Sequence, residues 1–263
     1  MTILVDKRGG YRVITLNRPE RLNAFNIALH EALAAAIDEA ASDESCRALL
    51  ITGAGRAFCS GQDLHDRVMK PGDVAAKAGE ALLKHYNPLL KKIRELPIPV
   101  VAAVNGVAAG AGCNLALAAD IVLAARSATF IEAFARIGLI PDVGGTFFLP
   151  RLAGMARARG MTMLAEAITA EQAEQWGLIW KVYDDDKLTG EAHAMCERLA
   201  KAPTFALGLT KRALEASVNN DLDAQLQLEY ELQKLAGSSP DYAEGVRAFL
   251  EKRKPNFTGK KPQ

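Results

Sequence analysis

Up to about residue 200, short apolar runs alternate along the chain with longer stretches of helix-forming residues. The short runs, each followed by turn residues, predict strands at 11–16, 48–52, 100–104 and 121–125. A stretch rich in Ala, Leu and Glu at 27–42 predicts a helix between the first two strands. A second helix, roughly 74–95, must end before Pro97 and Pro99. This order predicts an α/β architecture with largely parallel strands.

Beyond about residue 200 the pattern changes to consecutive helices. They are predicted at 204–218, 222–236 and 240–252. Four leucines, Leu222, Leu226, Leu232 and Leu235, fall on one helical face. That face either packs on the rest of the chain or forms a contact between subunits, and the spacing leaves both open. The chain is therefore divided into a core, 1–200, and a helical region, 201–263, whose polar tail from residue 254 is expected to be loosely ordered.

Charge and cysteine content narrow the class of protein. Lys and Arg number 32 and Asp and Glu 31, and this balance argues against nucleic acid as the main partner. No apolar run reaches about 18 residues, so no membrane span is expected. The first residues, MTILVDKRGG, lack the apolar segment of a secretory signal. The four cysteines are too widely spaced for a zinc site or a disulfide framework, which favours a cytoplasmic location.

Three glycine-containing segments, 53–64, 105–115 and 138–146, are candidates for chemistry. In the second, Gly and Ala crowd a strand-to-helix turn, where backbone N–H groups at a helix N-terminus bind a phosphate or stabilise an enolate. The alternative is tight helix packing by small residues. In the third, Asp142 lies between Pro141 and two glycines and is either a general base or a turn residue. The four histidines form no H-x-x-x-H pattern, so no metal site is predicted.

Six motifs follow one another along the chain, and the resemblance that they carry extends from about Val13 to Phe249. They are Asn17-Arg18-Pro19 with Leu22-Asn23-Ala24, Ser60-Gly61-Gln62-Asp63-Leu64, the 105–115 segment, Ala119-Asp120-Ile121, the 138–146 segment and Gly177-Leu178-Ile179. In this order they resemble the crotonase (enoyl-CoA hydratase/isomerase) superfamily. The resemblance implies a crotonase-like spiral of ββα units with a helical C-terminal oligomerisation region that forms homotrimers or hexamers. It also implies an acyl-CoA thioester as the substrate, with no separate cofactor because CoA is part of the substrate.

The resemblance also assigns roles to positions of this chain. The oxyanion hole consists of the backbone N–H groups of Gln62 and Ala111, and Ala111 replaces a common glycine, which a backbone contact tolerates. The implied substrate and CoA contacts are Arg21, Leu22, Ala24, Ala57, Ser60, Gly61, Asp63, Gly110, Asn114 and Phe134.

This sequence departs from the hydratases of the superfamily at both of their catalytic glutamates. Asn114 and Phe134 stand at those positions, and neither side chain transfers protons as a glutamate does. Asp142 stands where several isomerases carry their working aspartate. One carboxylate suffices to take a proton from one carbon and return it to another, which shifts a double bond. Glu132 is interpreted as a structural or surface residue rather than a second acid.

A further set of short segments is Gln62-Asp63-Leu64, Tyr86-Asn87-Pro88, 108–112, 138–142, Gln175-Trp176-Gly177 and Pro203-Thr204-Phe205. Within the superfamily these segments resemble the isomerase group of phenylacetate degradation. That group converts ring-1,2-epoxyphenylacetyl-CoA into an oxepin-CoA and moves 3-enoyl-CoA double bonds to the 2-position. Asp142 is then the base and proton shuttle, and Asn114 and Phe134 shape a dry pocket. Further pocket-lining candidates are Val68, Met69, Tyr86, Leu90 and Ile140. The alternatives are an enoyl-CoA hydratase with an unusual acid, a dehalogenase in which Asp142 attacks an aryl carbon, and a non-catalytic acyl-CoA-binding assembly protein.

Overall fold

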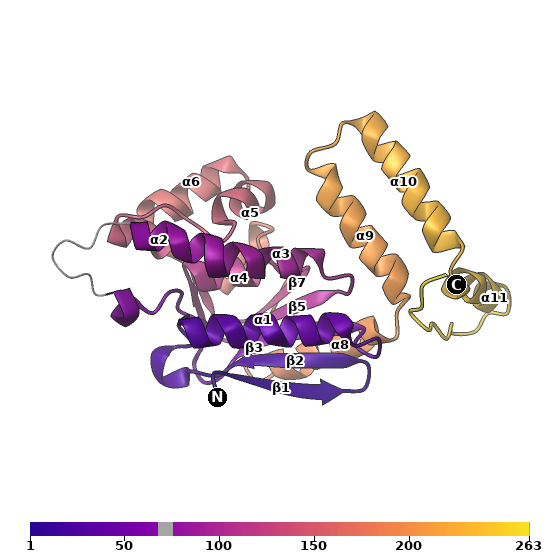
Figure 1. Cartoon of the computed structure of the whole chain (residues 1–263), viewed down its shortest axis with the longest axis horizontal. Coiled ribbons are helices and arrows are strands. Elements are labelled where there is room, and N and C mark those ends of the chain that lie inside the picture. Colours follow the sequence, from indigo (N-terminus) through magenta and orange to yellow (C-terminus); the bar gives the residue numbers. More distant parts are fainter. Residues whose placement is uncertain (68–75, 263) are drawn as a thin grey trace.

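The computed structural model describes residues 1–67 and 76–262. Two sheets form its centre, and helices cover them (Figure 1). The larger sheet has the strand order β1 (Ile3–Arg8), β2 (Tyr11–Leu16), β3 (Ala48–Gly53), β5 (Val100–Val104), β7 (Ile121–Ala125) and β10 (Lys181–Tyr183). The smaller sheet has the order β4 (Ala57–Cys59), β6 (Val107–Ala109), β8 (Thr129–Ile131) and β9 (Ala167–Thr169).

The two strands of each successive pair lie in different sheets, and this arrangement is the crotonase-like spiral. From β3 to β8, each odd-numbered strand lies in the larger sheet and the strand after it lies in the smaller one. The pairings among these strands within each sheet are parallel. Only the edges differ, because β1 pairs with β2 and β8 with β9 in antiparallel fashion. The prediction of an α/β fold with largely parallel strands is therefore confirmed.

Helices follow or separate the strands. They are α1 (Ile27–Ser42), α2 (Ala76–Ala81), α3 (Asn87–Glu95), α4 (Ala111–Leu117), α5 (Gly145–Leu152), α6 (Met155–Leu164), α7 (Ala170–Gln175) and α8 (Leu188–Ala200). Short turns of 3-10 helix occur at η1 (Pro19–Arg21), η2 (Leu64–Arg67) and η4 (Ala133–Ile137), and a π-helical turn, η3 (Leu82–Tyr86), joins α2 to α3. Asn26 caps α1 by accepting a hydrogen bond from the N–H of Leu29 at 2.9 Å.

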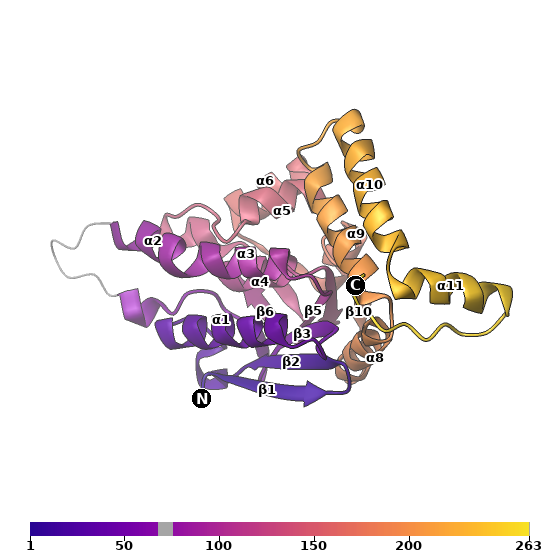
Figure 2. The same cartoon turned by 45° about the vertical axis from the view of Figure 1, so that its right-hand side comes forward.

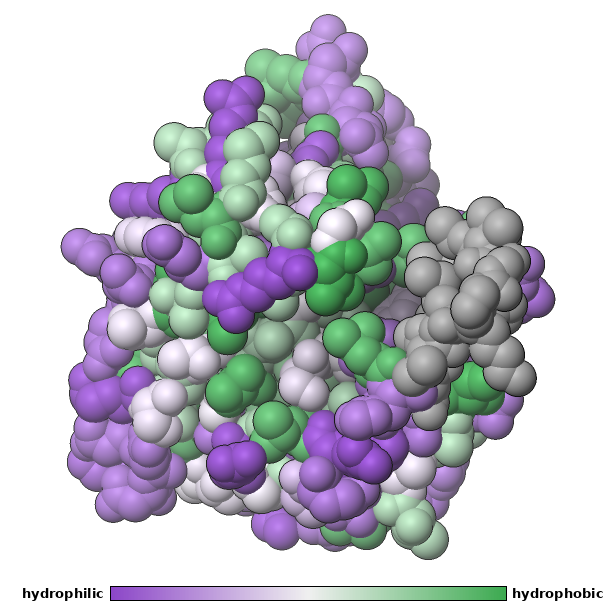
Figure 3. Space-filling view, turned by 90° about the vertical axis from the view of Figure 1, so that its left-hand side faces the viewer, coloured by the Kyte–Doolittle hydropathy of each residue, from purple (hydrophilic) through white to green (hydrophobic). Residues whose placement is uncertain are grey.

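The core explains why the central strands read as unbroken apolar runs. All five residues of β5 are buried, because a parallel strand covered on both faces has no polar side. Helix α8 packs against β3, β5 and β7, and α1 packs against β1, β2 and α3. Figure 3 shows the end of the molecule that holds α2 and η2, where apolar side chains gather across the middle of the surface between polar margins.

Three helices, α9 (Thr204–Ser217), α10 (Leu222–Gly237) and α11 (Pro240–Leu250), lie together beyond one end of the larger sheet (Figures 1 and 2). Helix α9 is tied to the core by Lys211, whose Nζ lies 2.9 Å from Asp120 Oδ2, and by an ion pair between Arg94 and Glu215. Of the four leucines predicted to share a face, only Leu232 is buried. The other three are 43–72 % exposed in the single chain, so this face does not pack on the core.

The expectation of a loosely ordered tail is wrong. The carboxylate of Asp241, which is 3 % exposed, accepts hydrogen bonds from the backbone N–H groups of Thr258 and Gly259, each at 2.7 Å. Arg47 donates to the carbonyl of Phe257 at 3.0 Å. Backbone hydrogen bonds to two charged side chains therefore hold a segment whose own composition is polar and proline-containing.

Candidate active site

Two tight turns, one in each of the first two glycine-containing segments, come together at the N-terminus of α4. Gly61 has a φ of +90° and Gly110 a φ of +52°, a region that side chains with a Cβ rarely adopt. A Cβ on Gly61 would lie 2.8 Å from the carbonyl oxygen of Ala109 and 3.5 Å from the backbone nitrogen of Ala111. The absence of a side chain at Gly61 is thus what allows the Gln62 turn to lie against Ala111, the first residue of α4.

Gln62 is held in this turn through its backbone neighbours and its side chain. The N–H of Phe25 donates to the carbonyl of Gly61 at 2.7 Å, and the N–H of Asp63 donates to the carbonyl of Phe25 at 2.9 Å. Gln62 Nε2 also donates to the Phe25 carbonyl at 3.0 Å, while Tyr86 Oη donates to Gln62 Oε1 at 2.9 Å. Phe25 therefore fixes the backbone on both sides of Gln62, and Phe25 and Tyr86 fix its side chain.

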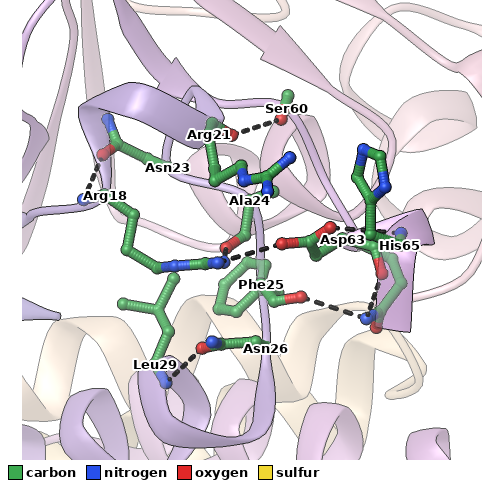
Figure 4. Close-up of polar contacts among 11 residues, drawn as sticks. Arg18, Arg21, Asn23, Ala24, Phe25, Asn26, Leu29, Ser60, Asp63 and His65 are labelled. Atoms are coloured by element: carbon green, nitrogen blue, oxygen red, sulfur yellow. Dashed lines mark hydrogen bonds and ion pairs between the residues drawn. The ribbon is translucent and has the colours of Figure 1, made fainter. Parts of the chain in front are cut away.

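The segment 18–24 lies beside the Gln62 turn (Figure 4). The N–H of Ser60 donates to the carbonyl of Leu22 at 3.0 Å, and Ser60 Oγ lies 3.4 Å from the carbonyl of Arg21. Asn23 Nδ2 donates to the carbonyl of Ala57 at 2.8 Å. The structure thus brings together all the residues predicted to bind CoA in these two segments. Arg21 is exposed, whereas Ala24 and Ala57 are buried.

Asp63 is turned toward Arg18 rather than toward open space. Its Oδ2 lies 2.9 Å from Arg18 Nη2, and the side chain is 6 % exposed (Figure 4). Burial opposes ionisation of this carboxyl, but hydrogen bonds from Arg18 and from the N–H of His65 outweigh it, so the pKa of Asp63 lies below its usual range. We therefore interpret Asp63 as an internal support of the turn, whereas its direct contact with substrate stays a prediction.

Asp142 lies opposite the N-terminal turn of α4 and is joined to it by Asn114. Asn114 is fully buried, and its Nδ2 donates to the backbone carbonyl of Asp142 at 2.8 Å. A Cβ on Gly145, the first residue of α5, would lie 2.5 Å from the same Nδ2, so this glycine is needed for the close approach. Asp142 is half-buried.

Phe134 closes the other side of this region. A Cβ on Gly110 would lie 3.6 Å from the ring of Phe134, and the ring is 7 % exposed. The predicted residues Asp142, Asn114, Phe134, Gly110 and Ala111 are thus brought together by the fold. No proton-transferring side chain stands at either position where the hydratases carry a glutamate.

The further residues predicted to line the pocket differ in where they lie. Tyr86 is buried and bonded to Gln62, and Leu90 lies against Gly144 beside Asp142. Ile140 is 79 % exposed in the single chain, and its place in the pocket stays a prediction. Val68 and Met69 lie outside the described residues.

Of the two positions predicted for Glu132, structural or on the surface, the structure shows the buried, structural one. The side chain is 0 % exposed rather than superficial, and its Oε2 lies 3.4 Å from Asn114 Nδ2. Burial is the main reason that the pKa of Glu132 is raised to about 7, with a further contribution from the charge of Asp142. The position of Glu132 fits its burial, because it directly follows the apolar strand β8 and lies two residues before Phe134.

Comparisons with known proteins agree with this geometry. The enoyl-CoA hydratase/isomerase family model matches residues 6–260. The 1,2-epoxyphenylacetyl-CoA isomerase of Escherichia coli strain K12 is 53 % identical, with 98 % of each chain covered. A probable enoyl-CoA hydratase of Rhodobacter capsulatus is 51 % identical, again with 98 % of each chain covered.

A solved structure shows the same fold. A putative enoyl-CoA hydratase/isomerase from Mycobacterium abscessus superimposes with a TM-score of 0.93 at 37 % identity, covering 98 % of this chain and 100 % of the other. The match spans the spiral and the C-terminal helices alike, because almost the whole of both chains is covered. Together with the family model, it shows that this chain belongs to the enoyl-CoA hydratase/isomerase (crotonase) family of enzymes.

Proposed function

We propose that this protein is a CoA-thioester isomerase that converts ring-1,2-epoxyphenylacetyl-CoA into an oxepin-CoA and shifts the double bond of 3-enoyl-CoA to the 2-position. The observation that carries the proposal is the composition of the site. Asp142 is held beside the α4 turn by Asn114, while Asn114 and Phe134 occupy the positions of the two hydratase glutamates. The 53 % identity to an epoxyphenylacetyl-CoA isomerase supports the same reaction.

The proposed mechanism moves one proton within the substrate. The thioester oxygen accepts hydrogen bonds from the backbone N–H groups of Gln62 and Ala111. Asp142 removes a proton from the carbon next to the thioester carbonyl, and the resulting enolate is stabilised by these two donors. Asp142 then returns the proton to a carbon further along the conjugated system. For the epoxide, that carbon belongs to the ring as it expands to the oxepin, so atoms balance without water, metal or a cofactor other than the CoA of the substrate.

The scaffold supports this role of Gln62 by holding its peptide rigidly. The backbone before and after Gln62 is held by hydrogen bonds of Gly61 and Asp63 to Phe25. The side-chain amide of Gln62 is held by Phe25 and Tyr86. A fixed donor needs little reorganisation when charge develops on the thioester oxygen, which is the main advantage of an oxyanion hole. The apolar ring of Phe134 keeps one wall of this region dry, which strengthens the hydrogen bonds and protects the epoxide from water.

Hydration is the second candidate, because one specific observation favours it. Glu132 is an acid within reach of Asn114, and a relative at 51 % identity is named a probable enoyl-CoA hydratase. Addition of water needs groups that activate the water and deliver a proton to carbon. Glu132 would have to supply that chemistry from a fully buried position, which makes hydration the weaker proposal.

The test is to give the purified protein a 3-enoyl-CoA and crotonyl-CoA in parallel and to follow the products by mass and chromatography. Isomerisation predicts that the first becomes the 2-enoyl-CoA at unchanged mass and that the second gains no water. Rapid addition of water to crotonyl-CoA would contradict the proposal and favour hydration. Turnover of the ring epoxide, prepared by chemical or enzymatic epoxidation, then decides the acyl group.

We also propose that the protein assembles as a homotrimer, or as a hexamer of paired trimers, through the region 201–263. The support is the exposed apolar surface of α10 and α11 in the single chain, to which Leu222, Tyr230 and Phe249 contribute. A cytoplasmic location is supported by the four cysteines, all of which are buried and free. Within the described part of the chain, no helix combines the length and apolar character needed to cross a membrane.

A further inference from the structure

Glu132 is an acid that the proposed mechanism does not use. It follows β8, and its side chain is 0 % exposed. Fully buried glutamates are rare unless a cation pairs with them, since a carboxylate loses its hydration on burial. No cation acts on Glu132 among the described residues. A residue of this kind lowers the stability of the fold when it ionises, so its presence next to a reactive centre needs a functional reason.

The contacts of Glu132 lead to Asp142 through a single side chain. Asn114 Nδ2 lies 3.4 Å from Glu132 Oε2 and 2.8 Å from the backbone carbonyl of Asp142. The buried Oε1 of Glu132 accepts no hydrogen bond from any described residue. One amide group thus joins the carboxyl of Glu132 to the backbone of Asp142, so a shift of the Glu132 side chain is passed to the loop that carries Asp142.

The ionisable surroundings of Glu132 are few. Helix α4 places the Cys113 thiol beside it, and the loop before α5 places Asp142 near enough for the two charges to interact. The neighbouring strands β6 and β9 carry no ionisable side chain, and both glutamates of α7 are exposed. Asp142 is therefore the charged group that Glu132 faces in the interior.

We propose that Glu132 is a positioning residue for the proton shuttle, which holds the Asp142 loop through Asn114 and, when ionised, increases the basicity of Asp142 by like-charge repulsion. The inference rests on the proposed role of Asp142 as the base. An ionised neighbour raises the proton affinity of Asp142, because the repulsion between the two carboxylates disappears when Asp142 takes up a proton. The pKa of Glu132, raised by its burial to about 7, places this change near neutral pH.

The expected consequence is a pH-dependent difference between wild type and Glu132→Gln. At pH near 6 Glu132 is largely neutral, as glutamine is, so kcat of the two proteins is expected to be similar. At pH near 8 only the wild type carries the second charge, and its kcat is expected to be about three- to tenfold higher, as a moderate dependence of rate on base strength predicts. KM changes little, because Glu132 lies behind Asn114 and Asp142. Glu174→Gln on the exposed face of α7 is the matched control and shows no difference at either pH.

A structural role alone predicts a different result. If Glu132 only supports the loop, Glu132→Gln lowers kcat by the same factor at every pH, and that outcome overturns the proposal. Retention of turnover by Asp142→Asn would instead overturn the proposed function. An inactive Asp142→Asn together with a pH-independent effect of Glu132→Gln overturns the role of Glu132 alone.

A second measurement needs neither activity nor a folded Glu132 variant. The infrared carbonyl stretch of a protonated carboxyl group reports ionisation of Glu132 in wild type and in Asp142→Asn. We expect a band that titrates near pH 7 in the wild type and at a lower pH in Asp142→Asn, because the repulsive negative charge of Asp142 has been removed. An unchanged midpoint in Asp142→Asn would show that the two carboxyls are not coupled.

Discussion

At the scale of the single residue, the carboxyl group of Glu132 links the stability of the fold to pH. Its pKa is about 7 in the folded protein against an ordinary value of 4.5. The folded state therefore keeps a proton that the unfolded chain releases. The stabilisation from this group is complete below pH 4.5 and is lost as the pH rises through about 7.

The stability of Glu132→Gln relative to wild type is expected to rise with pH. Glutamine does not ionise, so the variant avoids the burial of a charge. Its free energy of unfolding relative to wild type is expected to increase by about 3 kcal/mol between pH 4.5 and 7. Urea unfolding of both proteins at pH 5 and pH 8 measures this change. An equal difference in the free energy of unfolding at the two pH values would contradict it.

The family resemblance of the sequence predicted that five residues lie close together, while their roles in catalysis stay predictions. Asp142, Gly110, Ala111, Asn114 and Phe134 lie in short segments, and each is found next to the α4 turn as expected. The hydrogen-bond partners of Asp63 and Glu132 could not be predicted, for a common reason. Their roles depend on partners 18 to 45 residues away, Asn114 and Arg18, and no local pattern reports such contacts.

At the scale of the element, the site depends on two turns that approach each other closely. The turn at Gly61 combines a φ of +90° with the nearby carbonyl of Ala109. An added methyl group at this position both strains the backbone and displaces the turn from α4. The N–H of Gln62 would then leave the position where the thioester oxygen develops charge.

Gly61→Ala is therefore expected to lower kcat about a hundredfold or more, as loss of one oxyanion donor does in other enzymes. Gly154→Ala is the matched control, because Gly154 has a similar φ of +81° but nothing within 4 Å of the added Cβ. Both variants carry backbone strain, but only Gly61→Ala places a methyl group against the carbonyl oxygen of Ala109. Steady-state kinetics and urea unfolding of the two separate these effects, and similar kcat values would show that the turn does not form the oxyanion hole.

The elements themselves were predictable to different degrees. The residues 27–42, 11–16, 100–104 and 121–125 form α1, β2, β5 and β7 within the predicted bounds. The helix predicted at 74–95 is divided by the π-helical turn η3, and Val74 and Ala75 lie outside the described residues. The short strands β4, β6, β8 and β9 went unpredicted, because three residues that pair with distant partners have no periodicity of their own.

At the scale of the whole molecule, the helical region has an apolar surface that the single chain leaves uncovered. A groove of about 690 Å³ runs between α9 and α10 and is lined in part by Leu209, Leu226 and Tyr230. Leu226 and Tyr230 are 53 % and 65 % exposed. Contiguous apolar surface of this kind is typical of a subunit contact.

Leu226→Asp is expected to shift the assembly from trimers or hexamers toward monomers, because a buried charge at an apolar interface is unfavourable. Gln227→Asp adds the same side chain at the next, exposed position of α10 and serves as the control. Sedimentation velocity of both variants measures the change. A wild-type protein that sediments as a monomer would contradict the proposed assembly directly.

The proposed isomerisation depends on Asp142 as the base that moves the proton of the substrate. The most direct test is single-turnover kinetics of Asp142→Asn with a 3-enoyl-CoA, together with calorimetric binding of an acyl-CoA that cannot isomerise. The substitution keeps the size of the side chain and the backbone contact with Asn114. The account predicts a fall in the rate of at least about a hundredfold, as loss of a general base produces, with binding within a few fold of wild type. Isomerisation by Asp142→Asn at close to the wild-type rate would contradict the account.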